Sequence, residues 1–254
     1  MDAYASIASL YAIDFADVLD DVDFYRSLAR HSAGPIVEFM CGSGRVCVPL
    51  ARDGHTVTGV DISAAMLSHI PTHAQYRESL ALTTVQADMT EWQPDQKYGL
   101  AIVALNSFMH LQTTAEHLAA LQVAHRALRP GGTLVIDLFN PDMRHLPDYK
   151  GDLVLDKQFE MPDGRMVQKF VAQWSDTAQQ RIHVVFMYDI NDATQRIQRV
   201  NASFAMRYFW RFELEHLLAR AGFAVVDVYG SYDLAPYEAD SSQLIVVAQR
   251  DKKR

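Results

Sequence analysis

The chain has 254 residues, of which 49% are hydrophobic and 21% charged, which is typical of a folded protein with one large domain, or with one domain that carries an insertion. Its formal net charge of −8 argues against DNA or RNA as a partner, because nonspecific nucleic-acid binding needs a basic surface. No apolar run approaches the roughly 20 residues that span a bilayer, and the N-terminus lacks the basic start of a signal peptide, so we expect no membrane partner and a cytoplasmic location.

The first 30 residues contain an aromatic segment followed by a predicted helix. Tyr4 and Tyr11 lie among small residues that show no periodicity. The acidic run at residues 20–23 is favourable at a helix N-terminus, and the apolar spacing of residues 22–29 predicts a helix with one face on the core. We therefore expect an irregular segment and then a helix that packs on a sheet.

An apolar run at residues 36–40 leads into a glycine-rich turn at Gly42 and Gly44. The run predicts a buried parallel strand, and the glycines let the backbone turn sharply and approach a ligand closely. Helical spacing follows through residue 52, so a helix N-terminus would face that ligand. A dinucleotide-binding fingerprint would carry a third glycine where Cys47 stands, which weakens an NAD-dependent oxidoreductase of Rossmann fold but leaves it as an alternative.

Two further predicted strands end in an acidic residue. Asp61 closes the strand at residues 55–61 and follows Gly44 by 17 residues, near the roughly 20-residue offset at which an acid binds the ribose of a nucleoside. Asp88 ends the strand that begins at residue 82. Each acid has a plainer alternative, because Asp61 could cap the next helix, expected to run to Ile70, and Asp88 could cap its own strand.

The joint pattern of Glu38, Gly42, Gly44, Asp61 and Asp88 resembles the landmarks of the class I S-adenosylmethionine-dependent methyltransferases. Their first motif usually reads Glu/Asp-x-Gly-x-Gly-x-Gly, and Glu-Phe-Met-Cys-Gly-Ser-Gly here has methionine at one glycine position. The resemblance implies that Asp61 binds the ribose, and that Asp88 accepts a hydrogen bond from the adenine amine while an apolar neighbour covers the ring. It implies a cofactor site formed by Tyr11, Glu38, Phe39, Met40, Cys41, Gly42, Gly44, Asp61, Ile62, Met66, Asp88, Met89, Leu105, Asn106, Ser107 and His110.

The cofactor that the resemblance implies is S-adenosyl-L-methionine, with S-adenosyl-L-homocysteine as product. No metal is expected. The two cysteines, Cys41 and Cys47, are six residues apart, and the sequence has no second pair to complete a tetrahedral metal site. We therefore expect both to be reduced packing residues.

The later elements indicate a doubly wound α/β fold. Five strand–helix repeats are expected by residue 138, and Leu-Arg-Pro-Gly-Gly at residues 128–132, which resembles a turn of the family, is expected to reverse the chain tightly. The resemblance implies a mostly parallel, Rossmann-like sheet of seven strands whose last strand is antiparallel between two others. The expected elements after residue 90 are strands at 98–105, 133–138, 223–229 and 243–249 and helices at 114–128 and 211–221.

Between about residues 141 and 207 the hydrophobic pattern changes to a period of two, which predicts three or four antiparallel strands. We expect one class I methyltransferase domain over residues 1–254, with this insertion forming a cap over the active site. Aromatic side chains there suit the walls of a substrate pocket, although any one of them could belong to the insertion's own core. The expected substrate residues are Tyr4, Asn140, Trp174, Tyr208 and Trp210.

The expected reaction transfers a methyl group to a nitrogen or oxygen of a small aromatic or heterocyclic metabolite by direct in-line displacement. The sulfonium methyl is already activated, so the protein's part is alignment and exclusion of water. His110 is the best-placed candidate base, with Tyr11 as a second candidate and with Asp137 and His145 behind it. A packing role for His110, a non-catalytic S-adenosylmethionine-binding module, and a monomer or a homodimer all stay open.

Overall fold

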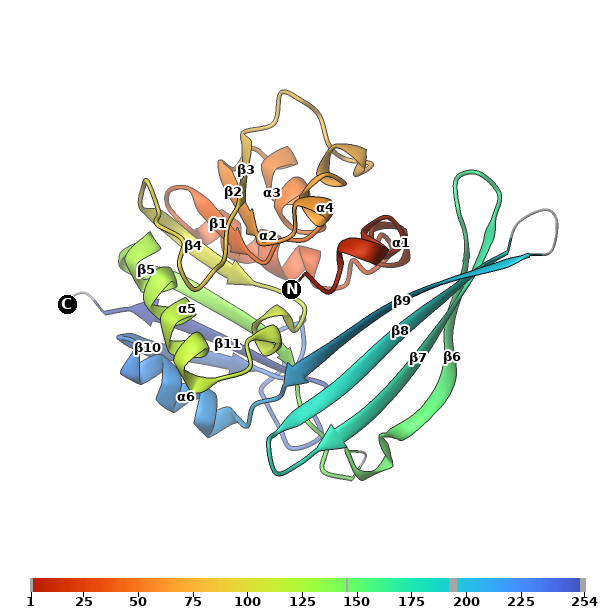
Figure 1. The fold of residues 1–254 in the computed structure, drawn as a ribbon. Coiled ribbons are helices and arrows are strands. Elements are labelled where there is room, and N and C mark those ends of the chain that lie inside the picture. Colours follow the sequence, from red (N-terminus) through yellow and green to blue (C-terminus); the bar gives the residue numbers. More distant parts are fainter. Residues whose placement is uncertain (1, 145, 192–195, 252–254) are drawn as a thin grey trace.

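The computed structural model describes residues 2–144, 146–191 and 196–251, so His145 lies outside the described residues. Seven strands form the main sheet, in the order β10-β11-β5-β4-β1-β2-β3 (Figure 1). Neighbours are parallel except at β11, which runs antiparallel to both β10 and β5. The strands are β1 (Ile36–Phe39), β2 (Val57–Asp61), β3 (Leu82–Gln86), β4 (Tyr98–Val103), β5 (Leu128–Phe139), β10 (Phe223–Tyr229) and β11 (Gln243–Arg250).

Helices cover both faces of this sheet, which confirms the doubly wound fold. One face packs against α2 and α3, and the other packs against α5 and α6. Every side chain of β1, β2 and β4 is buried, as expected of central parallel strands. The helices are α1 (Ala8–Asp14), α2 (Val22–His31), α3 (Cys47–Arg52), α4 (Ala64–Leu67), α5 (Thr114–Ala127) and α6 (Arg211–Arg220), with 3-10 turns η1 (Ala5–Ile7), η2 (Ile70–Thr72), η3 (Ser107–His110) and η4 (Leu146–Asp148).

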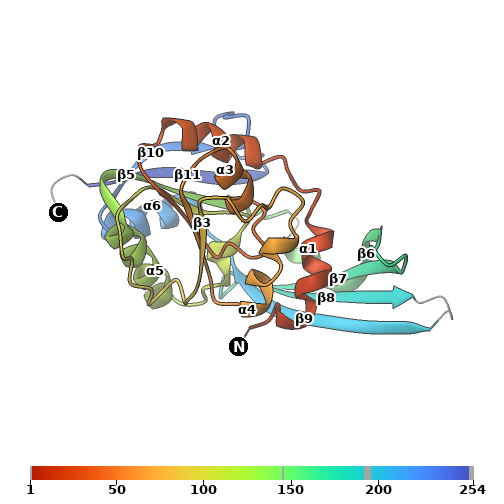
Figure 2. The same ribbon diagram turned by 90° about the horizontal axis from the view of Figure 1, so that it is seen from above.

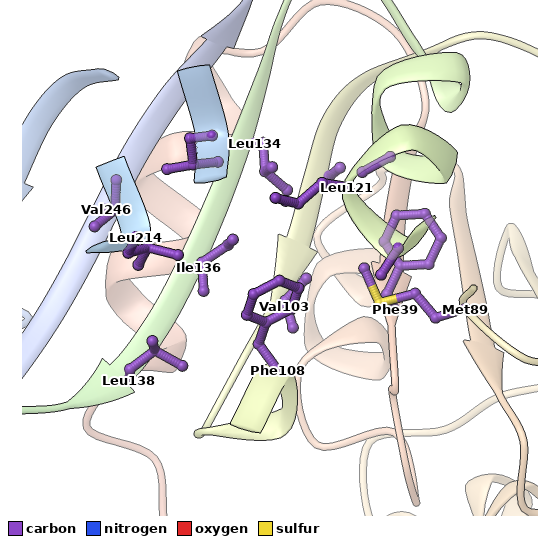
Figure 3. Close-up of a cluster of buried hydrophobic side chains, with 14 of the residues drawn as sticks. Phe39, Met89, Val103, Phe108, Leu121, Leu134, Ile136, Leu138, Leu214 and Val246 are labelled. Atoms are coloured by element: carbon purple, nitrogen blue, oxygen red, sulfur yellow. The ribbon is translucent and has the colours of Figure 1, made fainter. Parts of the chain in front are cut away.

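The period-two alternation of the strands divides the core into two layers. Phe39 lies in the layer under α5 and α6, whereas Ile36 lies in the layer under α2 and α3. Figure 3 shows Leu121 and Leu214 meeting side chains of β4, β5 and β11 in the first of these layers. Full burial of each such side chain contributes about 1.5–3 kcal/mol, so these contacts fix the helices on the sheet.

Three local expectations were wrong. The helix after Asp61 is a single turn, because Ser63 caps it through the Met66 amide and Pro71 then favours a separate 3-10 turn. The described residues between β3 and β4 contain no helix, so fewer strand–helix repeats precede residue 138 than expected. The turn expected at 128–132 is the start of β5 itself, where the register with β4 shifts between Tyr98 and Leu100.

The insertion is a four-stranded antiparallel sheet in the order β6-β7-β8-β9, at the upper end of the predicted strand number. Its four strands each span 11 residues: β6 (Lys150–Glu160), β7 (Met166–Asp176), β8 (Arg181–Asn191) and β9 (Ile197–Arg207). Figures 1 and 2 show this sheet extending away from the seven-stranded sheet. None of the described helices is long and apolar enough to cross a membrane.

The N-terminal segment packs on the inner face of the four-stranded sheet. Ile7 and Leu10 form a third buried cluster with Val167, Tyr188 and Ile190 of β7 and β8. α1 also contacts α4, which belongs to the main sheet's side of the molecule. Residues 2–14 therefore link the two sheets.

Candidate active site

A cavity of about 560 Å³ lies at the carboxyl ends of β1, β2 and β4, between the seven-stranded sheet, the N-terminal segment and strands β8 and β9. This is the edge at which open parallel sheets bind ligands. Of the residues expected in the cofactor site, those that line the cavity are Tyr11, Glu38, Met40, Cys41, Gly42, Asp61, Ile62, Met66, Asp88, Met89, Leu105, Asn106, Ser107 and His110.

Phe39 and Gly44 do not line this cavity. Phe39 is fully buried in the core and contacts Trp92, because the strand's alternation turns it to the opposite face. Gly44 has a φ of +90°, and a Cβ there would lie 2.9 Å from Cγ2 of Val48. Its role is to let the turn run close to α3, so its contribution to the cavity is indirect.

The glycine-rich turn is tied to the end of β2 through Asp61. The Gly42 amide donates to Oδ2 of Asp61 and the Ser63 amide donates to Oδ1, both at 2.8 Å. Met40 and Gly42 both have a φ of +55°, and for Met40 this left-handed conformation costs about 1–2 kcal/mol. Burial raises the pKa of Asp61, while the amide hydrogen bonds lower it. Each carboxylate oxygen keeps a second lone pair, so Asp61 can still accept from a diol.

Asp88 lies two residues after the end of β3. Its Oδ1 accepts from both the amide and the hydroxyl of Thr90, each at 2.7 Å. These bonds fix the side chain at the strand end, as the capping alternative expected. Because Asp88 and Met89 also line the cavity, the capping role and a ligand contact are compatible here.

Glu38 is a buried acid with an unused acceptor. It is 3% exposed, and its Oε2 has no hydrogen-bond partner among the described residues. Burial raises the pKa of Glu38 to about 8, although nearby Arg45 lowers it. Arg45 is itself held by Asp21, which accepts from both of its terminal nitrogens. An orphaned buried carboxylate beside a cavity is suited to bind a cationic ligand group.

A hydrogen bond joins Tyr4 and His110 at the cavity wall. The Tyr4 Oη and the His110 Nε2 are 3.0 Å apart, and both rings pack on Phe204 of β9. Burial lowers the pKa of His110 to about 4, so the imidazole is neutral at neutral pH. Burial also raises the pKa of Tyr4, which keeps its hydroxyl protonated. The pair can therefore exchange hydrogen bonds with a polar acceptor without carrying charge.

Tyr11 closes another part of the cavity. Its ring stacks on Phe15 with centroids 4.1 Å apart and meets Tyr4 edge to face. Burial raises the pKa of Tyr11 to about 12, so this hydroxyl is not a base at neutral pH. A wall contact suits Tyr11 better than a proton-transfer role.

Four of the five expected substrate residues do not line this cavity. Asn140 binds Tyr237 and the carbonyl of Ser241, and Trp174 is 41% exposed and stacks on His183. Tyr208 and Trp210 pack in and against the main core. Tyr4 alone of this group lines the cavity.

The aromatic walls come instead from β8 and β9, which sequence reasoning missed. Phe186 and Phe204 line the cavity, together with Met206 and the short stretch at Ser203 and Ala205. The two phenylalanines meet edge to face, with centroids 5.1 Å apart. The period-two alternation of β8 and β9 predicted alternating faces, but nothing in the sequence showed which face turns toward the cofactor site.

The described residues contain no group of three or more potential metal ligands among His, Cys, Asp and Glu. Asp137, expected behind His110, is buried between Tyr25 and Tyr232 and does not line the cavity. Both hydroxyls donate to its Oδ2, and burial raises its pKa to about 6. Asp137 therefore has a structural role, as the hydrogen-bond acceptor of the Tyr25 and Tyr232 hydroxyls.

Replacing Asp61 with alanine is expected to weaken S-adenosylhomocysteine binding by about 1–3 kcal/mol, because a charge-assisted contact with the ribose would be lost. Isothermal titration calorimetry measures this change directly. The exposed Asp95→Ala variant serves as the control and should bind normally. Unchanged affinity in Asp61→Ala would remove Asp61 from the ribose site.

The comparisons agree with this geometry. Residues 36–132 match the family model described as a methyltransferase domain. The cypemycin N-terminal methyltransferase of a Streptomyces species is 29% identical over 85% of this chain and 82% of its own length, and the glycine/sarcosine N-methyltransferase of Halorhodospira halochloris is 26% identical over 95% and 89%. A solved S-adenosylmethionine-dependent methyltransferase from Clostridium acetobutylicum has the same fold, with a TM-score of 0.80, 15% identity and coverage of 98% of this chain and 100% of that one.

These findings do not support the alternatives of a nicotinamide oxidoreductase or a binding module without turnover. The glycine-rich turn, the acids at the ends of β2 and β3 and the family match all lie in the same stretch of the chain. Residues 36–132 match the methyltransferase-domain family, the chain as a whole has the class I methyltransferase fold, and it is an S-adenosylmethionine-dependent methyltransferase.

Proposed function

We propose that this enzyme methylates an amino nitrogen of a small, ring-bearing metabolite. Two relatives that align over most of the chain are named for N-methylation, one of a peptide N-terminus and one of glycine and sarcosine. The aromatic cavity walls at Tyr4, Phe186 and Phe204 support an acceptor that carries a flat or ring-shaped apolar part. The observation that carries the proposal is the neutral Tyr4–His110 pair among these rings.

The charge of the cavity also favours an amine. The acidic side chains on its described lining are Asp2, Glu38, Asp61 and Asp88, whereas Arg45 is paired with Asp21. Glu38, whose pKa is raised to about 8, adds a negative charge only when it releases its proton. A cleft lined by one sign of charge attracts ligands of the opposite sign. A protonated amine and a sulfonium are both cations, so both would be drawn into this cavity.

We propose that each part of the cofactor contacts one of these acids. We propose that Asp61 accepts from the ribose hydroxyls, that Asp88 and Met89 hold the adenine, and that Glu38 binds the ammonium of the methionine end. The unpartnered Oε2 of Glu38 supports this fit, because a bound ammonium would supply its missing donor. S-adenosylmethionine supplies a methyl group that is already activated for displacement.

The chain's own residues orient the acceptor and exclude water. We propose that Tyr4 and His110 hold the amine by hydrogen bonds, so that its lone pair lies in line with the methyl–sulfur bond. The amine releases its extra proton to water and reacts uncharged: its lone pair bonds to the methyl carbon as the methyl–sulfur bond breaks, and the positive charge passes from sulfur to nitrogen. The neutral imidazole of His110, with a pKa of about 4, can accept a hydrogen bond from the amine, whereas Phe186, Phe204 and Met206 keep the site apolar. On this proposal, residues 1–254 form one domain in which the insertion at about 141–207 acts as a cap over the active site.

Replacing His110 with asparagine is expected to lower kcat/KM by about 10- to 100-fold, the effect of losing one or two hydrogen bonds that orient the acceptor. Tyr4→Phe should lower kcat/KM through the same contact. His117→Asn is the matched control, because His117 is also buried with a pKa lowered to about 4 but does not line the cavity. Initial rates with a methyl-labelled cofactor measure all three.

The acceptor itself can be found by screening matched pairs of amines and alcohols with labelled S-adenosylmethionine and detecting the product by mass spectrometry. We expect methyl transfer to the amine of each pair and little to the alcohol. Transfer to hydroxyl groups alone would contradict the proposal, and so would full activity in both His110→Asn and Tyr4→Phe.

A further inference from the structure

The outer face of the four-stranded sheet carries an unusual set of apolar side chains. The inner face of each strand packs on the N-terminal segment or on the main core, through residues such as Val167, Tyr188 and Phe204. The residues between them point the other way, because side chains alternate along a strand. Six of these outward residues form what we call the outer patch: Leu153, Leu155, Phe170, Ala172, Val185 and Met187.

The strand register places these six side chains next to one another. Leu155 pairs with Phe170, which pairs with Met187, and this gives one row across three strands. In the neighbouring row Leu153 pairs with Ala172, which pairs with Val185. None of the six belongs to the three buried clusters of the described structure. Leu153 and Leu155 are 50% and 47% exposed, Phe170, Val185 and Met187 are partly exposed, and Ala172 is 5% exposed.

Polar residues border the outer patch on two sides, and beyond the second row the same face continues with Trp174, which pairs with His183. Beyond the first row the register continues with Gln168, Asp189 and Arg199, and the last two form an ion pair at 2.6 Å. On the β9 side the rows end in Asn201 and Ser203. The solvent face of an antiparallel sheet normally carries polar residues, so an apolar area bordered by polar residues is a feature of interfaces.

We propose that the outer patch is the interface of a twofold homodimer, in which the four-stranded sheets of two copies pack face to face. Four strands of 11 residues give a face of about 35 by 19 Å, or roughly 650 Å², which approaches the ~800 Å² per partner of a standard interface. The six residues carry no charge, so they suit an equally uncharged, apolar surface. An identical sheet is such a surface, and two sheets pack well when their strands cross at about −30°.

The arrangement of the molecule leaves room for this contact. Figures 1 and 2 show the four-stranded sheet projecting from the seven-stranded sheet, so a second copy can approach it. The inner side of the same strands holds Phe186 and Phe204 in the cavity wall. The dimer would therefore support the cap from behind. This inference does not depend on which acceptor the enzyme methylates.

Sedimentation velocity over low to high micromolar concentrations tests the proposal on the full chain. The native protein should sediment as a dimer of twice 28.6 kDa. Val185→Glu should raise the dimer dissociation constant by at least about 100-fold, because a twofold interface would bury the new carboxylate twice. Met187→Glu should act in the same way.

The matched control is Val226→Glu, the same substitution at a half-exposed strand position on β10, which should leave the dimer intact. Thermal melting and S-adenosylhomocysteine binding report whether each variant is folded. A native protein that stays monomeric over the whole range would overturn the proposal, whether the patch is free or binds a different protein. A dimer that survives in folded Val185→Glu and Met187→Glu would overturn it as well.

Discussion

Replacing Lys169 with alanine is expected to lower the free energy of unfolding by about 3–5 kcal/mol, because a buried carboxylate would lose its counter-ion. Lys169 is 4% exposed, and its Nζ lies 2.9 Å from Oδ2 of Asp14 and 2.9 Å from Oδ2 of Asp156. The same nitrogen lies 4.8 and 4.3 Å from the ring centroids of Phe15 and Phe186. Urea unfolding followed by circular dichroism measures the loss.

The loss should extend to ligand binding. Asp14 ends α1, and Tyr188 of β8 also donates to it at 2.9 Å, so this cluster fixes the N-terminal segment on the four-stranded sheet. Phe15 and Phe186 line the cavity directly beside it. We therefore expect Lys169→Ala to weaken S-adenosylhomocysteine binding as well, although Lys169 itself does not line the cavity.

Two further variants make this prediction specific. Lys157→Ala removes a partly exposed lysine that pairs with Asp17 at 2.7 Å and lies 3.6 Å from Oδ1 of Asp14, so it should cost less than Lys169→Ala, about 1 kcal/mol. The double variant Asp14→Leu with Lys169→Met removes both charges and should recover much of the stability. Equal losses of unfolding free energy in Lys157→Ala and Lys169→Ala would contradict the prediction that the buried Lys169–Asp14 pair stabilises the fold more than the partly exposed lysine does.

Replacing Glu38 with glutamine is expected to change stability and cofactor binding in opposite directions. The folded-state pKa of Glu38, about 8, lies above its ordinary value of 4.5, so the folded protein binds a proton that the unfolded chain releases between these values. The contribution of Glu38 to stability is therefore greatest below about pH 4.5 and is lost as the pH rises through about 8. Glu38→Gln, which cannot ionise, should be more stable than the native protein by about 1–3 kcal/mol near pH 8.

The pH dependence of cofactor binding should be opposite to that of stability. If Glu38 binds the cofactor's ammonium, its carboxyl must lose a proton on binding, so the native affinity for S-adenosylhomocysteine should rise from pH 6 toward about pH 8. In Glu38→Gln that rise should disappear and the affinity should fall by about 10- to 100-fold. Calorimetry at several pH values, in buffers of different ionisation enthalpy, measures both the affinity and the proton release.

Asp137→Asn is the control for a buried carboxyl outside the cavity lining, because the pKa of Asp137 is also raised, to about 6. It should keep the rise of affinity between pH 6 and 8. A native affinity that is flat over this range, or a Glu38→Gln variant that binds normally, would exclude Glu38 as the ammonium site.

The cofactor side of the site could be predicted because its signals are local. Asp61 ends the buried strand β2 and Asp88 follows the edge strand β3, and parallel strands bring their carboxyl ends to one edge whatever the rest of the chain does. Gly42 follows the first strand for the same reason. Phe39 was misplaced because one step along a strand turns a side chain to the opposite face.

The substrate side could not be predicted in this way. Trp174 and Phe186 both lie on alternating apolar strands, yet one is on the outer face and the other lines the cavity. The contact between Lys169 and Asp14 joins residues that are far apart in the chain, and nothing near either residue indicates the other.

The sequence by itself therefore determined the fold, the methyl donor and the acids that surround it, since strand period, glycine turns and strand-end acids are properties of short segments. Only the tertiary structure decided which face of the inserted sheet closes the cavity, which tyrosine meets His110, and why Glu38 has no partner. The physical reason is that the two faces of an amphipathic strand become distinct only when another layer packs against one of them, and burial then sets both the wall of the site and the pKa of its acids.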